Sequence, residues 1–350
     1  KGYISNLRAV KGTAVYTAQF VTPTQPLTAI SGTSLLTCAA PILIDQSSAV
    51  LAITPNGNAL ATNNYPFATA ATATATVPQY SMYFDGSDDY VRFPNNAATN
   101  IGTGDFTMEF WMYGYNGNTA RLVSNSDWNT SAGYDIAIED GEVHFRSGNN
   151  NDKVFTYSAD DYTKWIHVAY SRTGTTFRVF KTGIIQNTYT TASYLTSANP
   201  TTLASQGGGG FPSDFFNGYI SNLRIVKGSA LYTANFAPTI APLTAVSGTG
   251  LLTCQSATII DNSGNSLAAT VNGNTTPVPK APFYPSAGSN VSTSGSTYFD
   301  GTGDYLKLPY STNFNCPTSF TVEFWVNFNS LSGYQQLFDL RTTKIGRAHV

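Results

Sequence analysis

The chain has 350 residues and a formal net charge of −2, with 11% charged and 13% aromatic residues. A nearly neutral chain has no electrostatic attraction to nucleic acid or to anionic lipid, and disordered chains contain few aromatic residues. No apolar run approaches the roughly 20 residues of a membrane-spanning helix. Composition therefore excludes a disordered chain, and it predicts no nucleic-acid partner and no membrane insertion.

Three motifs occur twice, in the same order and about 215 residues apart. They are Gly2-Tyr-Ile-Ser-Asn-Leu-Arg with its copy from Gly218, Tyr83-Phe-Asp-Gly with its copy from Tyr298, and Glu109-Phe-Trp with its copy from Glu323. Solenoid units are only about 20–50 residues long, so each copy is expected to hold its own core. The order predicts a tandem array of one domain, and it predicts that the chain opens inside one copy and stops inside another.

Strand patterns dominate the complete copy, and no amphipathic helix pattern is found. Phe106–Met112 alternates, which places Phe106, Met108, Phe110 and Met112 on one face. Tyr134–Phe145 is predicted to be a hairpin, because Asp140-Gly141 suits the two positive-φ positions of a tight turn. Many short strands between turns favour an all-β, antiparallel two-sheet sandwich.

Further strands are predicted at Trp165–Arg172 and Thr176–Phe180, with a turn at Lys181–Gly183. In Gly218–Ile225 the apolar side chains break the alternation, and a single β-bulge would restore it. Trp111 and Phe180 point away from the predicted core face. The second face of this sheet is therefore expected to be covered by a loop, a neighbouring domain or a ligand.

Four ordered motifs resemble the signature strands of laminin-G-like domains, which belong to the concanavalin A-like lectin/glucanase jelly rolls. They begin at Tyr83, Phe106, Trp165 and Phe216. The resemblance implies a jelly-roll β-sandwich. It says less about activity, because this fold hosts lectins, glycosidases, pentraxins and adhesion modules.

The same resemblance sets the predicted domain bounds. Residues 1–32 are expected to be the last strand and linker of a preceding copy, 33–247 the complete domain, and 248–350 the first part of the next copy. The proline-containing linkers near Pro23 and Pro238 are expected to be extended spacers. Residues 344–350 resemble a translated sequencing adapter, and the chain is therefore expected to be a metagenomic fragment.

Catalytic chemistry is not predicted. Glycoside hydrolysis needs two carboxylates that face each other, and the nearest candidates, Glu139 and Glu142, lie on opposite arms of the predicted hairpin. Glu109 has no acidic partner two residues away and is interpreted as structural. His144 and His167 are expected to be surface or edge imidazoles, since neither has a nucleophile beside it at a motif position.

Asp85, Asp88 and Asp89 offer hard oxygen ligands in one turn, so calcium is a possible cofactor. Two observations favour a purely conformational turn instead. The second copy retains only Asp300 and Asp304, and Asp-Gly turns are common without a metal. The acidic loop of pentraxin-like relatives is also missing from the corresponding stretch of this chain.

A polar loop with aromatic residues is the predicted ligand-binding surface. An aromatic ring beside amides and carboxylates suits a sugar, which has apolar C–H faces and hydroxyl groups. The candidate residues are Asp127, Trp128, Asn129, Tyr134 and Asn149. The alternative is that Trp128 packs onto the edge of the sheet.

These patterns predict a non-catalytic carbohydrate-binding or adhesion repeat protein. Its repeated phrases resemble those of environmental phage structural proteins, which implies a tail or host-recognition component. The expected location is the virion, the extracellular space or a cell surface, with cell-surface glycans or other surface proteins as partners. Two alternatives remain: an accessory module of a glycan hydrolase or lyase, and an architectural spacer in a surface adhesin.

Overall fold

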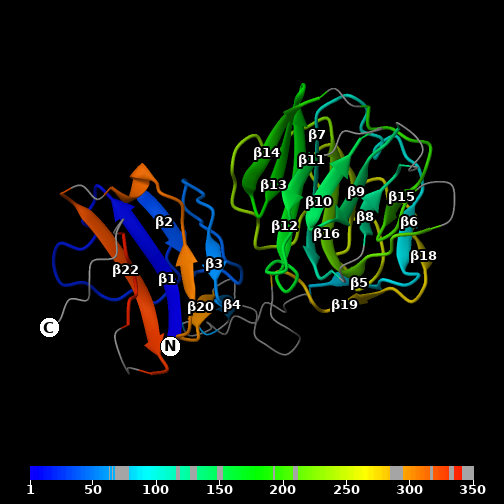
Figure 1. Cartoon of the computed structure of the whole chain (residues 1–350). Coiled ribbons are helices and arrows are strands. Elements are labelled where there is room, and N and C mark those ends of the chain that lie inside the picture. Colours follow the sequence, from blue (N-terminus) through cyan, green and yellow to red (C-terminus); the bar gives the residue numbers. More distant parts are fainter. Residues whose placement is uncertain are drawn as a thin grey trace. The chain divides into compact units, whose positions relative to one another are not determined.

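The computed structural model describes residues 1–62, 64, 66–67, 79–115, 119–126, 132–147, 153–191, 194–207, 212–283, 295–315, 318–330 and 335–340. The chain divides into two compact units (Figure 1). Unit 1 comprises Lys1–Ala70 and Ser294–Val350, and unit 2 comprises Ala71–Thr293. In the described residues the only helix is a 3-10 turn at Thr312–Phe314, so none could span a bilayer.

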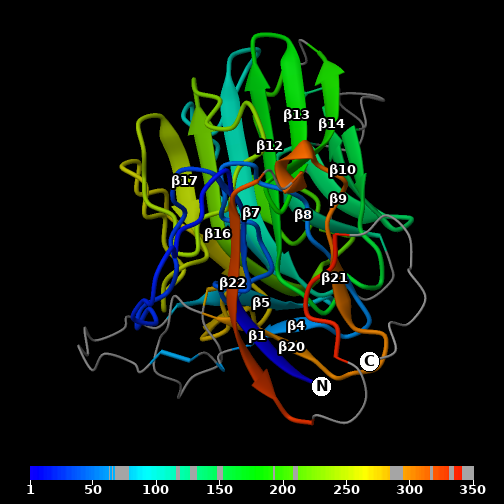
Figure 2. The same cartoon turned by 90° about the vertical axis from the view of Figure 1, so that its left-hand side faces the viewer.

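The larger sheet of unit 2 has eight strands, all paired antiparallel. In spatial order they are β14 (Ile184–Thr190), β13 (Thr176–Lys181), β12 (Ile166–Thr173), β7 (Phe106–Tyr113), β16 (Asn217–Lys227), β5 (Ser81–Asp85) and β19 (Thr276–Val278), with β17 (Thr249–Thr253) also beside β16. Figure 2 shows β12, β13 and β14 of this sheet next to one another.

The smaller sheet of unit 2 has seven antiparallel strands. In spatial order they are β11 (Lys153–Thr156), β10 (Glu142–Arg146), β9 (Asp135–Glu139), β8 (Ala120–Ser124), β15 (Thr201–Leu203), β6 (Tyr90–Phe93) and β18 (Thr270–Asn272). The inner faces of the two sheets enclose one hydrophobic core. Phe145 of the smaller sheet lies 4.8 Å from Tyr170 and 5.0 Å from Phe177 of the larger one, measured between ring centroids. The all-β, two-sheet prediction is confirmed.

Local predictions agree with this sandwich. The hairpin between β9 and β10 turns at Asp140 and Gly141, both with positive φ (51° and 77°). The register between β16 and β7 shifts between Ser221 and Arg224, and Asn222 between them has a φ of 54°. The shift is the predicted bulge, and it keeps both ends of β16 paired with β7.

The outer face of the larger sheet is covered by the chain itself. Tyr232 and Phe236 stack at 3.5 Å, and both rings pack against Phe180. Phe283 packs edge-on against Trp111 at 5.6 Å. The segment that connects β16 to β17 (residues 228–248, here called the covering segment) therefore lies on the sheet, because its aromatic side chains bury apolar surface there.

The structure places the boundary of unit 2 differently from the predicted 33–247 domain. Strands β17, β18 and β19 follow residue 247, yet they pair with β16, β6 and β5 of unit 2. The Leu-Leu-Thr-Cys motif, which β17 contains except for its cysteine, therefore belongs to the same sheet as β16, the strand before it in the chain. Strands that follow one another in a chain usually lie side by side, and β17 is the next strand after β16, although 21 residues (228–248) connect them.

Unit 1 repeats part of this architecture with strands from both ends of the chain. β1 pairs with three strands on the same sheet (Figure 1), and two short strands form a separate pair. The strands are β1 (Gly2–Lys11), β2 (Thr33–Thr37), β4 (Leu60–Thr62), β20 (Ser296–Phe299) and β22 (Phe320–Phe328), with β3 (Thr54–Asn56) paired to β21 (Tyr305–Lys307). β1 pairs with β20 and β22 as β16 pairs with β5 and β7.

Candidate functional site

Four of the five predicted glycan contacts, Asp127, Trp128, Asn129 and Asn149, lie outside the described residues. The fifth, Tyr134, is corrected by the structure: its side chain is 0% exposed and belongs to the core of unit 2. Its hydroxyl lies 3.3 Å from Oγ1 of Thr201, and burial raises its pKa. Tyr134 precedes β9 and alternates with Ile136 and Ile138, which explains why it faces inward.

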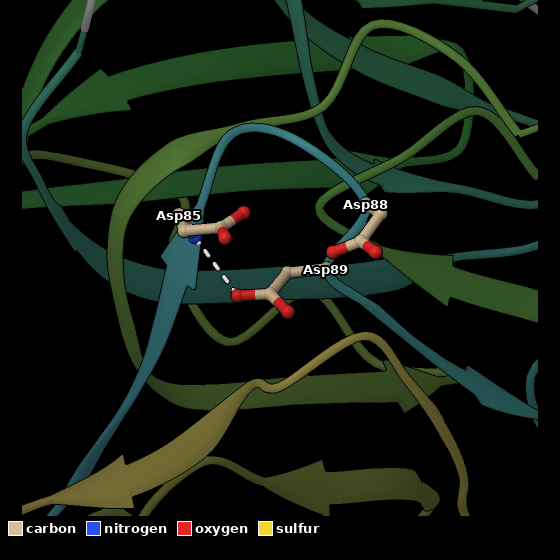
Figure 3. Close-up of side chains that lie close together, drawn as sticks. All are labelled: Asp85, Asp88 and Asp89. Carbon is tan, nitrogen blue, oxygen red and sulfur yellow. Dashed lines mark hydrogen bonds between the residues drawn. The ribbon is translucent and has the colours of Figure 1, made fainter.

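The three aspartates of the predicted calcium turn do gather (Figure 3). One carboxylate oxygen from each of Asp85, Asp88 and Asp89 lies within 4.8 Å of the others. Asp89 is 0% exposed, and its two oxygens accept backbone N–H bonds from Asp85 (2.9 Å) and Asn274 (2.7 Å). Asp89 thus fastens the β5–β6 turn to the β18–β19 turn.

The link that Asp89 makes between the two turns, here called the turn clamp, requires Gly273. It has a φ of 72°, and a Cβ atom there would lie 2.3 Å from Oδ1 of Asp89. Unit 1 has the same arrangement without a third carboxylate: Asp304 accepts from the backbone of Asp300 (2.5 Å) and Asn58 (2.7 Å). Both oxygens of Asp89 already accept backbone N–H bonds, so this carboxylate has a structural role that needs no cation. The turn clamp therefore accounts for the position of the three aspartates.

Replacing Asp89 by alanine is expected to destabilise unit 2 by about 2–4 kcal/mol, since two backbone N–H groups lose their acceptor. Asp88→Ala is the matched control, because Asp88 is exposed and should change stability by less than about 0.5 kcal/mol. Urea unfolding with and without calcium measures both. If calcium raised the stability of the natural protein and Asp88→Ala abolished that gain, the turn would be a metal site.

A buried ionic cluster lies on the outer face of the larger sheet. Glu109 accepts hydrogen bonds from Arg224 (Nε, 3.0 Å) and from the Tyr232 hydroxyl (2.8 Å), and its Oε2 lies 3.2 Å from Nε2 of His167. Arg224 also donates to the backbone oxygen of Thr244 at 2.7 Å. The cluster therefore holds the covering segment against the sheet at two points.

His167 corrects a second prediction. It is 1% exposed, whereas a surface or edge imidazole was expected. Its strand, β12, lies between β7 and β13, and the covering segment closes over it through Phe236. Glu109 is structural, as predicted, and its counterpart Glu323 in unit 1 binds Arg8 and Tyr16 in the same way.

The other carboxylates considered for catalysis, Glu139 and Glu142, lie in the β9–β10 hairpin. Glu139 and Glu142 are directly opposite each other in the β9–β10 hairpin, as predicted. Glu139 accepts a bond from Arg146, and this bond lowers its pKa, whereas a general acid needs a raised one.

A row of four partly exposed aromatic side chains crosses the larger sheet. They come from four neighbouring strands or their ends: Trp165 before β12, Tyr113 in β7, Tyr219 in β16 and Tyr83 in β5. Neighbouring ring centroids along this aromatic row are 5.6, 5.8 and 5.0 Å apart. Three strand spacings of about 4.8 Å give the row a length of roughly 14 Å.

Lys280 lies over the middle of the aromatic row. Its Nζ is 3.6 Å from the ring centroid of Tyr113 and 4.0 Å from that of Tyr219, which is cation–π geometry. Burial lowers its pKa, and within the described residues no carboxylate forms an ion pair with it. The row therefore combines aromatic rings, tyrosine hydroxyls and one ammonium that has no carboxylate partner in the part of the chain that the structure describes.

Unit 1 has a reduced version of this surface. Tyr3 and Tyr298 pair at 5.0 Å, as Tyr219 and Tyr83 do, but Asn327 stands where Tyr113 stands in unit 2. The tyrosines recur in both copies of their motifs, and that recurrence at outward positions was the available sequence signal. Recognising the row also requires the register of four strands, which the sequence alone does not provide.

Residues 85–232 match the family model Laminin_G_3, described as the concanavalin A-like lectin/glucanases superfamily. Together with the two antiparallel sheets, the match identifies unit 2 as having the concanavalin A-like fold. No curated protein matches the chain.

Solved structures with distant likeness include the following three. One is a Bacteroides ovatus protein thought to bind carbohydrate (14% identity, 58% of this chain, 60% of that chain, TM-score 0.42). Another is domains LG4-5 of the mouse laminin alpha1 chain (15% identity, 47% of this chain, 48% of that chain, TM-score 0.34). The third is the binding domain of botulinum neurotoxin DC, solved with rat synaptotagmin II (18% identity, 57% of this chain, 48% of that chain, TM-score 0.34). The chain thus spans about half to three fifths of each.

Proposed function

We propose that the chain is a non-catalytic carbohydrate-binding and adhesion protein built of tandem units, and that the aromatic row of unit 2 contacts the glycan. The row is the observation that carries the proposal. Sugar rings present apolar C–H faces that stack on aromatic rings, and their hydroxyls bond to tyrosine hydroxyls and amides. A row of roughly 14 Å gives room for more than one sugar ring.

Lys280 favours an acidic glycan as the ligand. Lys280 has no carboxylate partner among the described residues, and its ammonium group lies 3.6 Å from a ring centroid, so it can pair with a carboxylate or sulfate on a sugar stacked beside it. Partial burial strengthens such a pair relative to one in bulk water. The ligand class is therefore a glycan that carries acidic sugars.

The arrangement of carboxylates supports a binding role. Glu109 is buried beneath the covering segment and Glu139 is paired with Arg146, so neither is free to protonate a leaving group. When several units are linked in one chain, weak binding at each single site is strengthened through avidity. We infer an extracellular, cell-surface or virion location, and the resemblance of the repeated phrases to phage structural proteins favours a phage tail as the source.

A glycan array with acidic and neutral sugars tests the proposal on the whole chain, with and without a calcium chelator. Trp165→Ala is expected to weaken binding about tenfold, the loss of one ring contact. Lys280→Gln is expected to remove the preference for acidic over neutral glycans. Tyr310→Ala is the control, since this tyrosine is 80% exposed and lies in unit 1.

Three outcomes contradict the proposal. Binding that is unchanged in Trp165→Ala places the site elsewhere, with the 126–134 loop as the next candidate. No binding to any glycan favours the architectural spacer. Release of shortened glycans would indicate the hydrolase or lyase alternative.

A further inference from the structure

The side chain of Lys280 occupies part of the surface that the proposed function assigns to the glycan. Its Nζ lies 3.6 Å from the ring centroid of Tyr113 and 4.0 Å from that of Tyr219. Atoms in van der Waals contact are about 3.5–4.0 Å apart, so no sugar ring fits between the ammonium group and these two rings. Given the proposed function, we propose that Lys280 is a displaceable occupant of the aromatic row, which excludes neutral sugars from its two middle rings until an acidic sugar draws the ammonium group away.

The middle of the aromatic row is a corner that the ammonium group fills. The rings of Tyr113 and Tyr219 are inclined at 77° to each other, and Lys280 lies close to the centroids of both. Trp165 is a neighbour of both tyrosines, with its ring centroid 5.6 Å from that of Tyr113 and 6.4 Å from that of Tyr219. A sugar that stacks on either middle ring must therefore take the place of the lysine.

Lys280 is held by its backbone, whereas its side chain can turn away. Its backbone N–H donates to the carbonyl oxygen of Val278, the last residue of β19, at 2.8 Å. On its other side, Ala281 and Phe283 are buried. Lysine has a flexible four-carbon stem, so the ammonium group can leave the rings without any change in the strands.

The energetics of this contact oppose neutral ligands and favour acidic ones. A cation–π contact changes an equilibrium constant by roughly two- to thirtyfold, which a ligand can overcome. Burial lowers the pKa of Lys280, and among the described residues no carboxylate forms an ion pair with it. A neutral sugar only removes the cation–π contact. A sugar with a carboxylate or sulfate removes it too, but supplies the charged partner that the ammonium group lacks.

Unit 1 lacks both the lysine and its tyrosine. Asn327 stands where Tyr113 stands in unit 2, and it lies opposite Tyr3 as Tyr113 lies opposite Tyr219. Asn64 follows β4 as Lys280 follows β19, at the corresponding place in the repeat. The two residues are thus replaced together, as expected if the lysine acts on the ring beneath it.

The test compares the natural full chain with Lys280→Ala and Lys280→Met on an array of paired glycans. Each pair consists of a neutral oligosaccharide and the same oligosaccharide with its C6 hydroxyl groups oxidised to carboxylates. Lys280→Ala frees the rings, so its affinity for neutral glycans is expected to rise roughly two- to thirtyfold while the preference for the acidic member disappears. Methionine still packs on the rings but has no charge, so Lys280→Met is expected to bind neutral glycans within about twofold of the natural protein.

Two results on this array overturn the inference and leave the proposed function standing. One is an affinity for neutral glycans that is unchanged or lower in Lys280→Ala. The other is an equal gain in Lys280→Ala and Lys280→Met, because the charge alone would then exclude neutral sugars. Absence of binding to every glycan by the natural protein and both variants overturns the proposed function, and the inference with it.

NMR spectroscopy of the natural protein labelled with 13C-lysine tests the position of the lysine without any glycan. Protons over the face of an aromatic ring resonate upfield. The ε-protons of Lys280, assigned by their loss in Lys280→Ala, are therefore expected upfield of those of the other lysines, and they should move back when an acidic glycan binds. An ordinary position in the free protein, or no movement on binding, overturns the inference.

Discussion

Replacing Glu109 by alanine is expected to destabilise unit 2 by about 3–5 kcal/mol, because it leaves Arg224 buried without its carboxylate. It also removes the acceptor of the Tyr232 hydroxyl and so frees the covering segment. Urea unfolding followed by tryptophan fluorescence measures the loss, since Trp111 packs within the same layer as His167.

Glu323→Ala is the matched comparison in unit 1. Its side chain is 13% exposed, against 1% for Glu109, and water can partly replace the lost bonds. We expect Glu323→Ala to lose less stability than Glu109→Ala. A loss below about 1 kcal/mol for Glu109→Ala would show that the cluster does not stabilise the sheet.

The same cluster makes stability depend on pH. Burial raises the pKa of Glu109, but His167 and Arg224 lower it by more, so that it lies below the ordinary value of 4.5. A carboxylate with a lowered folded-state pKa stabilises fully above its unfolded pKa and loses that stabilisation as the pH falls. The advantage of the natural protein over Glu109→Gln is therefore expected to shrink below about pH 4.5. An advantage that is constant down to pH 3 would contradict this assignment.

Asn222→Ala is expected to cost about 2–4 kcal/mol. The Asn222 side chain accepts the backbone N–H of Leu243 at 2.8 Å, and losing that acceptor leaves a buried donor unpaired. Alanine must also adopt a φ of 54°, which adds about 1–2 kcal/mol.

Asn222→Gly separates these two effects, because glycine tolerates positive φ but lacks the side-chain bond. We expect the glycine variant to be about 1 kcal/mol more stable than the alanine variant. Limited proteolysis within 229–246 should become faster in both. Equal stability of the two variants would mean that the backbone conformation contributes nothing.

Patterns that depend on neighbouring residues were predictable from the sequence. Phe106–Met112 alternates over its own length, Asp140-Gly141 specifies its own turn, and the broken alternation around Asn222 marks the bulge. Each of these signals is contained within a few residues, so no knowledge of distant partners was needed.

Features that depend on distant residues were missed. His167 was assigned to the surface because strand alternation identifies an outward face but not what covers it. The cover comes from Tyr232 and Phe236, more than 60 residues later. The aromatic row likewise requires the pairing of strands as distant as Tyr83 and Tyr219.

The pairing of β19 with β5 determines how unit 2 responds to mechanical load. The first residue of β5, Ser81, lies opposite the last residue of β19, Val278, so tension that reaches unit 2, after β1 has separated from β20 and β22 in unit 1, pulls on both strands from the same end. Phe283 must first leave its contact with Trp111. The residue pairs of β5 and β19 then separate one after another, starting from that end. Once tension reaches it, unit 2 would therefore yield at a lower force than a sheet pulled in shear.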